Sequence, residues 1–347
     1  MRIQATARNQ AHTFDTAPGE TILDAGLRSA IALPYECGSG TCGTCRARLV
    51  GGEVDDRWPE APGRRLLKAD AGELLMCQAV ARTDCALEIP VKVEPMAEGA
   101  CVPGAQSGVV RDWTALTHDV VQFDLDLDRP LTFEAGQFVL LGVDGIAGRR
   151  AYSMVNYERP APRLRFVIKK KPGGRVSEWL FAPGAEGARL TVFGPLGGAI
   201  FTPDLDRHLL CVAGGSGIAG LISILDRASG AGHFERRRGH VYFGVRSARD
   251  LFFARELSAL RRRAPAALEI TVALSEAEVT DALRAAHPDL AFDTGFVHEV
   301  AARHMTEWVE DVRAYVAGPP PMVDAMLRLL LREARLSPRD IRYDKFS

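Results

Sequence analysis

Four cysteines have the side-chain type and the spacing to bind iron. Cys37, Cys42 and Cys45 form a C-x4-C-x2-C run, and Cys77 follows at a distance. Four thiolates at this spacing can hold a two-iron cluster, and the glycines among them let backbone N–H groups approach the sulfur atoms. Zinc sites usually use two C-x2-C pairs, and a disulfide framework is not expected in a long chain without a signal peptide. The run therefore predicts a [2Fe–2S] cluster.

A second group of residues has the chemistry to bind a flavin dinucleotide. Arg150, Tyr152 and Ser153 lie in one strand-like stretch. An arginine offers a fork to a pyrophosphate oxygen, a tyrosine ring can lie against an isoalloxazine, and a serine hydroxyl can hydrogen-bond near the flavin N5. Alone this triplet is weak, because any barrel strand can carry Arg-Ala-Tyr-Ser. Gly174 and Ser177 strengthen it, because they open a helix whose free N–H groups favour a phosphate. Ser177 either serves that phosphate or caps the helix, and we favour the cap.

A third group predicts a site for a nicotinamide dinucleotide. Gly214, Gly215 and Gly217 follow the buried strand 208–213 and precede a helical stretch. A glycine-rich run is weak evidence by itself, but the position between a strand and a helix is the context that makes it credible. Glycines suit this position, because without side chains the backbone can approach a pyrophosphate closely.

The elements that must position these groups fall into consecutive units. Residues 1–94 combine short strands and one helix around the cysteine run, and 95–104 form a Pro- and Gly-rich linker. Regularly spaced short strands in 105–203 predict an antiparallel β-barrel. Strands that alternate with helices in 204–347 predict an α/β unit with a doubly wound parallel sheet.

The motifs together resemble a known family. The order strand, strand, helix, cysteine loop and late cysteine is similar to the β-grasp fold of plant-type [2Fe–2S] ferredoxins. Arg-Ala-Tyr-Ser at 150–153, the Gly-Gly stretch at 173–177 and Gly-Pro-Pro-Pro-Met at 318–322 resemble motifs of the ferredoxin-NADP reductase superfamily. Trp58-Pro59 after the cysteine loop resembles the ferredoxin segment of toluene-monooxygenase-type reductases. As a whole the chain resembles the NADH-dependent reductase components of bacterial multicomponent oxygenases.

The resemblance implies three cofactors: a [2Fe–2S] cluster, FAD and NADH. It assigns FAD binding to Arg150, Tyr152, Ser153, Val167, Lys169, Gly174, Val176, Ser177 and Phe346. It assigns binding of the nicotinamide dinucleotide to Gly214, Gly215, Gly217, Arg246, Asp250, Gly318, Pro319 and Met322. Tyr152, Ser153 and Phe346 are expected beside the flavin, and no acid–base pair is required.

Two arguments about the choice of nicotinamide disagree. Arg246 and Arg249 follow the second strand of the α/β unit and could favour the 2′-phosphate of NADPH, whereas Asp250 can reach the ribose 2′-hydroxyl of NADH. Similar G-x-R-x-x-x-D stretches occur in NADH-using reductases of the family. We therefore predict NADH.

The resemblance also implies partners. The expected acceptor is the terminal oxygenase component, Rieske or di-iron, reached directly or through a separate ferredoxin. The alternative is a stand-alone NADH:acceptor reductase that serves a non-oxygenase partner, such as a sugar-deoxygenating dehydratase. Trp58-Pro59 tilts the interpretation towards di-iron aromatic monooxygenases.

Composition and charge restrict the remaining possibilities. The formal net charge of −1 provides no global basic field for nucleic acid, and no apolar run has the length of a membrane span. Without a targeting segment at the N-terminus, the expected location is the cytoplasm. We expect a monomer.

Overall fold

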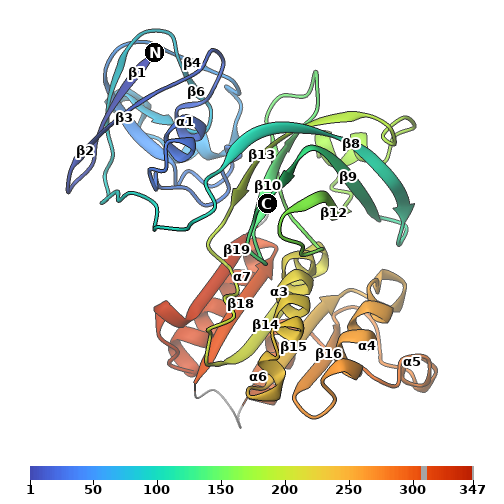
Figure 1. Cartoon of the computed structure of the whole chain (residues 1–347). Helices are drawn as coiled ribbons and strands as arrows, with labels where there is room; N and C mark the ends of the chain where they lie inside the picture. The colour runs from blue at the N-terminus through green and yellow to red at the C-terminus, as the bar shows by residue number, and fades with distance from the viewer. Residues whose placement is uncertain (306–310, 346–347) are drawn as a thin grey trace.

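The computed structural model describes residues 1–305 and 311–345 and arranges them as three units (Figure 1). The N-terminal unit, in blue, lies beside the green middle unit, and the C-terminal α/β unit lies below that middle unit in this view. Within the described part of the chain, no helix is long and apolar enough to cross a membrane.

The first unit is a β-grasp fold. Its five-stranded sheet has the order β2-β1-β7-β3-β5, and β1 and β7 run parallel within it. The strands are β1 (Arg2–Thr6), β2 (Ala11–Asp15), β3 (Arg46–Gly51), β5 (Glu73–Leu75) and β7 (Cys85–Glu88), with β4 (Val54–Asp56) and β6 (Ala79–Ala81) paired separately. Helix α1 (Ile22–Arg28) begins after its N-cap Thr21, whose hydroxyl accepts from Asp24 N–H at 3.2 Å. Short 3₁₀ turns are η1 (Pro62–Leu66) and η2 (Ala69–Ala71).

The middle unit is an antiparallel barrel with strand order β11-β10-β13-β8-β9-β12. Its elements are β8 (Gly104–Ala115), β9 (Val120–Leu131), β10 (Phe138–Gly142), β11 (Arg150–Ser153), β12 (Ala161–Lys169), α2 (Arg175–Leu180) and β13 (Arg189–Leu196). A hydrogen bond from Val155 N–H to the Arg165 carbonyl, 2.9 Å long, brings the two edges of the sheet together. Val176 and Leu180 of α2 belong to the barrel core.

The third unit is the predicted α/β fold, and its six strands are all parallel, in the order β17-β16-β15-β14-β18-β19. The strands are β14 (His208–Gly214), β15 (Gly239–Val245), β16 (Leu268–Leu274), β17 (Ala291–Thr294), β18 (Val312–Gly318) and β19 (Ile341–Lys345). The helices are α3 (Ile218–Gly230), α4 (Ala254–Arg263), α5 (Asp281–Ala286), α6 (Val297–His304) and α7 (Pro320–Arg328). Shorter turns are η3 (Gly215–Gly217), η4 (His233–Glu235), η5 (Ala248–Asp250), η7 (Leu329–Glu333) and η8 (Pro338–Asp340).

The strand order of this sheet locates its binding crevice. The chain starts at β14, adds strands on one side as far as β17, and then returns to the other side of β14 with β18. Ligands of open α/β sheets bind at the carboxyl ends of the strands where the order reverses. The reversal lies between β14 and β18, so the glycine run after β14 and the Gly-Pro-Pro-Pro-Met stretch after β18 meet there.

The β-grasp unit and the barrel share an apolar core. Phe138, Leu140, Phe193 and Leu196 of the barrel pack with the buried residues of the β-grasp unit. At the edge of this contact the hydroxyl of Tyr35 accepts a hydrogen bond from Gly197 N–H at 3.0 Å. The two units are therefore docked on one another through buried apolar surface.

A buried ion pair reinforces the docking. Arg149 of the barrel contacts both carboxylate oxygens of Asp24 at 2.7 and 2.9 Å, and the Asp24 side chain is only 6% exposed. Burial raises the pKa of Asp24 even though Arg149 opposes that shift. The cost of removing this carboxylate from water thus exceeds the gain from its partner, which is common for buried pairs.

The barrel and the α/β unit also meet through polar contacts. The hydroxyl of Ser223 on α3 accepts from Gly136 N–H at 2.9 Å, and the Tyr315 hydroxyl on β18 donates to the Ile200 carbonyl at 2.9 Å. These bonds hold α3 and β18 against the barrel. The barrel residues Val120 and Lys169 line the cavity of the α/β unit.

We predict that Arg149→Met destabilises the docked β-grasp unit by roughly 3–5 kcal/mol, because it leaves the Asp24 carboxylate buried without its ion-pair partner. Asp24→Asn should cost less, since an amide removes the charge that is expensive to bury. Urea unfolding followed by intrinsic tryptophan fluorescence measures both changes.

The exposed pair of Arg48 and Glu88 provides the control, because both side chains are 50% exposed. Arg48→Met should change stability by less than about 1 kcal/mol. Equal losses for Arg149→Met and Arg48→Met would show that the buried pair does not hold the two units together.

Candidate functional site: a cluster loop, a flavin strand and a dinucleotide cavity

The four predicted cluster cysteines converge as two close pairs. The Sγ atoms of Cys45 and Cys77 lie 3.2 Å apart. The thiols of Cys37 and Cys42 hydrogen-bond to one another. A two-iron cluster uses two thiolates on each iron, so two pairs of cysteines fit the expected ligation.

The backbone of the loop also fits a cluster. Gly43 has a φ of 75°, a conformation that a side chain would strain. The N–H groups of Ser39 and Thr44 donate to the Sγ atoms of Cys37 and Cys42, each at 3.4 Å. Hydrogen bonds to sulfur favour the thiolate, and the bond from Cys42 is the largest contribution that lowers the pKa of Cys37 to about 4.

The predicted flavin residues on β11 lie next to the β-grasp unit. The Arg150 guanidinium carbon lies 4.4 Å from the centroid of the Trp58 ring. Burial lowers the pKa of Arg150, and the positive charge of Arg175 at the start of α2 lowers it further. Two guanidinium groups within electrostatic range of each other favour an anion between β11 and α2, the expected place of the FAD pyrophosphate. Sequence reasoning missed Arg175, because Arg175 and Arg150 are far apart in the sequence and interact only in the folded chain.

Of the two other flavin-side residues on β11, Ser153 lies at the junction with the α/β unit, whereas Tyr152 packs against the barrel core. Ser153 is 8% exposed and lies against α3, where a Cβ added at Gly220 would be 3.3 Å from the Ser153 Cβ. Burial raises the pKa of Tyr152 far above its usual value, so its phenol stays protonated. Phe346, the third residue predicted here, lies outside the described residues.

The interpretation of Ser177 as a helix cap was wrong. The N-cap of α2 is Gly174, and Ser177 lies inside the helix. The Ser177 hydroxyl accepts from Lys171 N–H at 3.1 Å and donates to the Gly174 carbonyl at 2.9 Å, so it holds the turn before α2. Val167 and Val176 are buried at 4% and 2% exposure. Their contact with FAD stays a prediction.

The eight residues predicted for the nicotinamide dinucleotide all line one cavity of about 340 Å³. They are Gly214, Gly215, Gly217, Arg246, Asp250, Gly318, Pro319 and Met322. Lys169, predicted as a flavin contact, lines the same cavity from the barrel side. The cavity also has wall residues that sequence reasoning missed, among them Ser275 and Phe296. Ser275 follows the carboxyl end of β16, so the rule that found the glycine run would also have found Ser275.

The glycines of the cavity are required by close packing at the reversal point. A Cβ on Gly217 would lie 2.4 Å from the Ala317 carbonyl oxygen, and one on Gly318 would lie 2.6 Å from the Met322 Cε atom. Gly318 also has a φ of 153°. Any side chain here would push apart the two loops that form the cavity floor.

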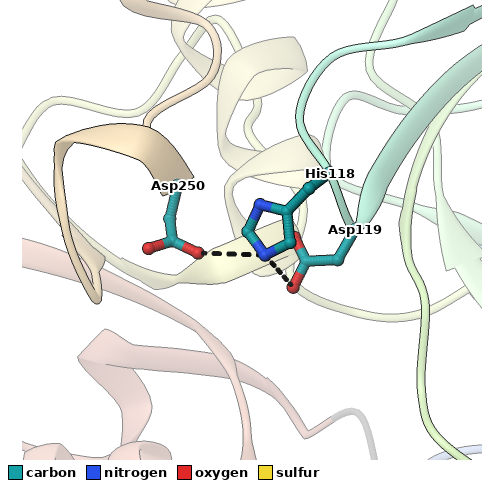
Figure 2. A group of neighbouring side chains, drawn as sticks. All are labelled: His118, Asp119 and Asp250. Atoms are coloured by element: carbon teal, nitrogen blue, oxygen red, sulfur yellow. Dashed lines mark ion pairs between the residues drawn. The ribbon is translucent and has the colours of Figure 1, made fainter.

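Charged groups from two units meet at one end of the cavity. The Arg246 Nη2 atom lies 2.7 Å from Asp250 and 3.1 Å from Asp119, and Lys169 lies 3.1 Å from the same Asp119 oxygen. Figure 2 shows His118 between the two carboxylates, at 3.7 Å from Asp119 and 3.9 Å from Asp250. The hydrogen bonds from Ser247 and Arg246 outweigh burial and lower the pKa of Asp250. Neither His118 nor Asp119 belongs to a motif, so sequence reasoning missed both.

The last described strand lies within electrostatic range of the residue before the cluster loop. Asp344 of β19 is paired with Ala317 of β18. Removal from water and the nearby Glu36 carboxylate raise the pKa of Asp344 to about 7. Glu36 precedes the first cluster cysteine, so the C-terminal strand lies within electrostatic range of the loop that carries the cysteines.

Comparison with known proteins agrees with this arrangement. The family described as 2Fe-2S iron-sulfur cluster binding domain matches residues 5–82, the oxidoreductase FAD-binding domain matches 107–201, and the oxidoreductase NAD-binding domain matches 211–328. The chain is 36% identical, over 94% of its length and 95% of the relative, to the ferredoxin–NAD(P)(+) reductase CarAd of Metapseudomonas resinovorans.

Two further relatives cover nearly the whole chain. The ferredoxin–NAD(+) reductase component of the alkene monooxygenase system of Xanthobacter autotrophicus is 35% identical over 97% of this chain and 99% of its own. The solved ferredoxin reductase in carbazole 1,9a-dioxygenase superposes with a TM-score of 0.83 at 32% identity, over 100% of this chain and 99% of that chain.

The fold and site thus define an iron–sulfur flavoprotein oxidoreductase that uses a [2Fe–2S] cluster, FAD and a nicotinamide dinucleotide. The chain belongs to the family of ferredoxin–NAD(P)+ reductase components of multicomponent oxygenase systems.

We predict that Cys42→Ser removes or destabilises the cluster while NADH still bleaches the flavin, because the serine hydroxyl is a poor thiolate substitute and the flavin lies in another unit. The measured iron content should fall below about two irons per chain, and the acid-labile sulfide content should fall with it. Cys85→Ser is the matched control, since Cys85 is a buried cysteine outside the loop. Zinc without labile sulfide in the unaltered protein would contradict the cluster assignment.

We predict that Arg150→Ala weakens FAD binding roughly tenfold to 150-fold, the equivalent of a lost charge-assisted hydrogen bond of about 1.5–3 kcal/mol. FAD titration followed by flavin fluorescence measures the change. Trp58→Leu distinguishes the stacking of Arg150 on Trp58 from its expected bond to FAD, because this variant removes the stacking but keeps the guanidinium. Unchanged FAD affinity in Arg150→Ala would assign the pyrophosphate to another residue.

Proposed function

We propose that this chain takes a hydride from NADH and delivers electrons one at a time to the oxygenase component of a multicomponent mono- or dioxygenase. The observation that carries the proposal is that strand β11 contacts both neighbouring units: Arg150 stacks on Trp58 of the β-grasp unit, and Ser153 lies against Gly220 of α3 in the α/β unit. Bound FAD would accept two electrons together from a nicotinamide and would pass them one at a time to an iron–sulfur cluster.

The residues of the site divide into three proposed roles. Cys37, Cys42, Cys45 and Cys77 ligate iron. Arg150, Tyr152 and Ser153 hold FAD, with further contacts from Val167, Lys169, Gly174, Val176, Ser177 and Phe346. The eight cavity residues position the nicotinamide dinucleotide. These roles match a division into a [2Fe–2S] domain at 1–94, a linker at 95–104, an FAD domain at 105–203 and an NAD domain at 204–347.

The contact between cluster loop and barrel supports transfer inside the chain. A Cβ on Gly38 would lie 3.3 Å from Leu140 and 3.7 Å from Leu196, so the barrel packs directly on the cluster loop. The charge of the Cys37 thiolate raises the pKa of Arg150, although burial outweighs this effect. A cluster ligand and a flavin residue are therefore within electrostatic range of each other.

NADH over NADPH is part of the proposal. Asp250 lines the cavity, and its lowered pKa keeps it an ionised acceptor for a ribose hydroxyl. Arg246, whose charge could favour NADPH, is already bonded to two carboxylates.

Relatives with oxygenase partners support the oxygenase over a dehydratase as acceptor. One is named for an alkene monooxygenase system and another for carbazole 1,9a-dioxygenase. The tilt towards a di-iron partner, which rested on the resemblance at Trp58-Pro59, stays a prediction. We propose a monomeric, cytoplasmic protein that serves a Rieske or a di-iron component, directly or through a separate ferredoxin.

The test is NADH-driven reduction of purified Rieske and di-iron oxygenase components by this protein under anaerobic conditions, with NADPH in parallel. We expect one oxygenase class to be reduced and kcat/KM to favour NADH. The Cys42→Ser variant is the control, since it should still reduce ferricyanide but no oxygenase. Reduction of a sugar-deoxygenating dehydratase, and of no oxygenase, would favour the alternative function.

A further inference from the structure

We propose that Asp119, a residue of the FAD domain, is a specificity-determining residue for the nicotinamide cofactor: it holds Arg246 so that this guanidinium cannot receive the 2′-phosphate of NADPH. This inference rests on the proposed preference for NADH and adds the residue that produces it. Asp119 acts through Arg246 and is therefore a positioning residue.

The geometry places Asp119 where this role requires it. Asp119 lies in the loop between β8 and β9, and its carboxylate accepts from Arg246 Nη2 at 3.1 Å across the boundary between barrel and α/β unit. The same nitrogen donates to Asp250 at 2.7 Å. Arg246 lines the dinucleotide cavity, at the end of the strand where discrimination between ribose and ribose phosphate takes place.

The Asp119 carboxylate is held in place by its own loop. The Thr117 hydroxyl donates to its Oδ1 atom at 3.1 Å, which leaves Oδ2 as the oxygen that binds Arg246 and Lys169. The Asp119 carbonyl accepts from Lys170 N–H at 2.7 Å, which ties the loop to the end of β12. The Asp119 side chain is 18% exposed, so water screens these contacts less than at the surface.

Charge explains how this arrangement rejects a phosphate. Asp119 and Asp250 face Arg246 and Lys169, so the formal charges of the four groups cancel. A 2′-phosphate adds about two negative charges near pH 7 and meets no net positive charge in these four groups, whereas a 2′-hydroxyl only needs an acceptor such as Asp250. Without the Asp119 charge the group becomes net positive, and the guanidinium fork can turn to a phosphate.

A metal site is the competing explanation of the cluster. The ligand atoms of His118, Asp119 and Asp250 lie within 4.8 Å of one another (Figure 2). Arg246 and Lys169, however, already occupy the two carboxylates, and cations at these positions oppose a third cation. The group of His118, Asp119 and Asp250 is therefore better explained by its two carboxylates, which neutralise the charge of Arg246.

The experiment compares kcat/KM for NADPH with that for NADH, using ferricyanide as acceptor, in the unaltered protein and in Asp119→Asn. We expect Asp119→Asn to raise the NADPH/NADH ratio about tenfold, a change of about 1.4 kcal/mol in discrimination. A purely structural role would lower both values alike and leave the ratio unchanged. Calorimetric binding of 2′-phospho-ADP-ribose and ADP-ribose provides a readout without turnover and should shift in the same sense.

Asp126→Asn is the matched control, because Asp126 is another FAD-domain carboxylate bonded to an arginine, Arg163, at 2.6 Å. The NADPH/NADH ratio of kcat/KM in this variant should equal that of the unaltered protein. In an Arg246→Ala background, Asp119→Asn should change the ratio by less than about twofold, as expected for two groups that act as one unit.

An unchanged ratio in Asp119→Asn, with NADH still preferred by the unaltered protein, would overturn this inference and leave the proposed function intact. An equal rise in Asp126→Asn, or a full effect in the Arg246→Ala background, would also overturn it, because a general charge effect would then be sufficient. A preference of the unaltered protein for NADPH would overturn the proposed cofactor choice together with this inference.

Discussion

The packing of the β-grasp domain on one strand of the barrel is the constraint on which the rest depends. Arg149 and Arg150 are adjacent in sequence at the start of β11, and both turn to the β-grasp domain, one to the Asp24 carboxylate and the other to the Trp58 ring. The strand expected to hold FAD is therefore also the strand that holds the cluster domain. Proximity of the two redox groups follows from this packing, because the linker alone would allow many separations.

The interface has a physical cost that explains its composition. The Asp24 carboxylate is expensive to bury, and Arg149 does not fully compensate it. Apolar contacts of Phe138, Leu140 and Leu196 with the β-grasp core must supply the net stability of the contact. The ion pair then fixes the position of the β-grasp domain on the barrel, because any other position would bury the two charges without their partners.

The dinucleotide cavity is likewise an interdomain structure. Its floor belongs to the α/β unit, where the reversal of strand order between β14 and β18 separates two glycine-containing loops. One of its charged walls comes from the barrel, through Lys169 and the loop that ends at Asp119. The electrostatics that the adenosine end of a nucleotide meets are therefore complete only when barrel and α/β unit are in contact.

The sequence by itself determined the parts of this protein whose information is local. The cysteine spacing, the glycine run between strand and helix, and the alternation of strands predicted three modules, and the resemblance of the local motifs to a known family implied the cofactors and the eight cavity residues. Each of these signals lies within a few residues or one supersecondary unit. Only the tertiary structure decided how distant charges combine. The convergence of Arg150 with Arg175, the burial of Asp24 against Arg149 and the bond from Arg246 to Asp119 join residues of separate segments. Such pairs leave no periodicity or motif, since their energy depends on distance and burial that only packing defines. The same reason made Ser177 misleading, because the residue has a capping side chain but lies inside α2, where the backbone already supplies its partners.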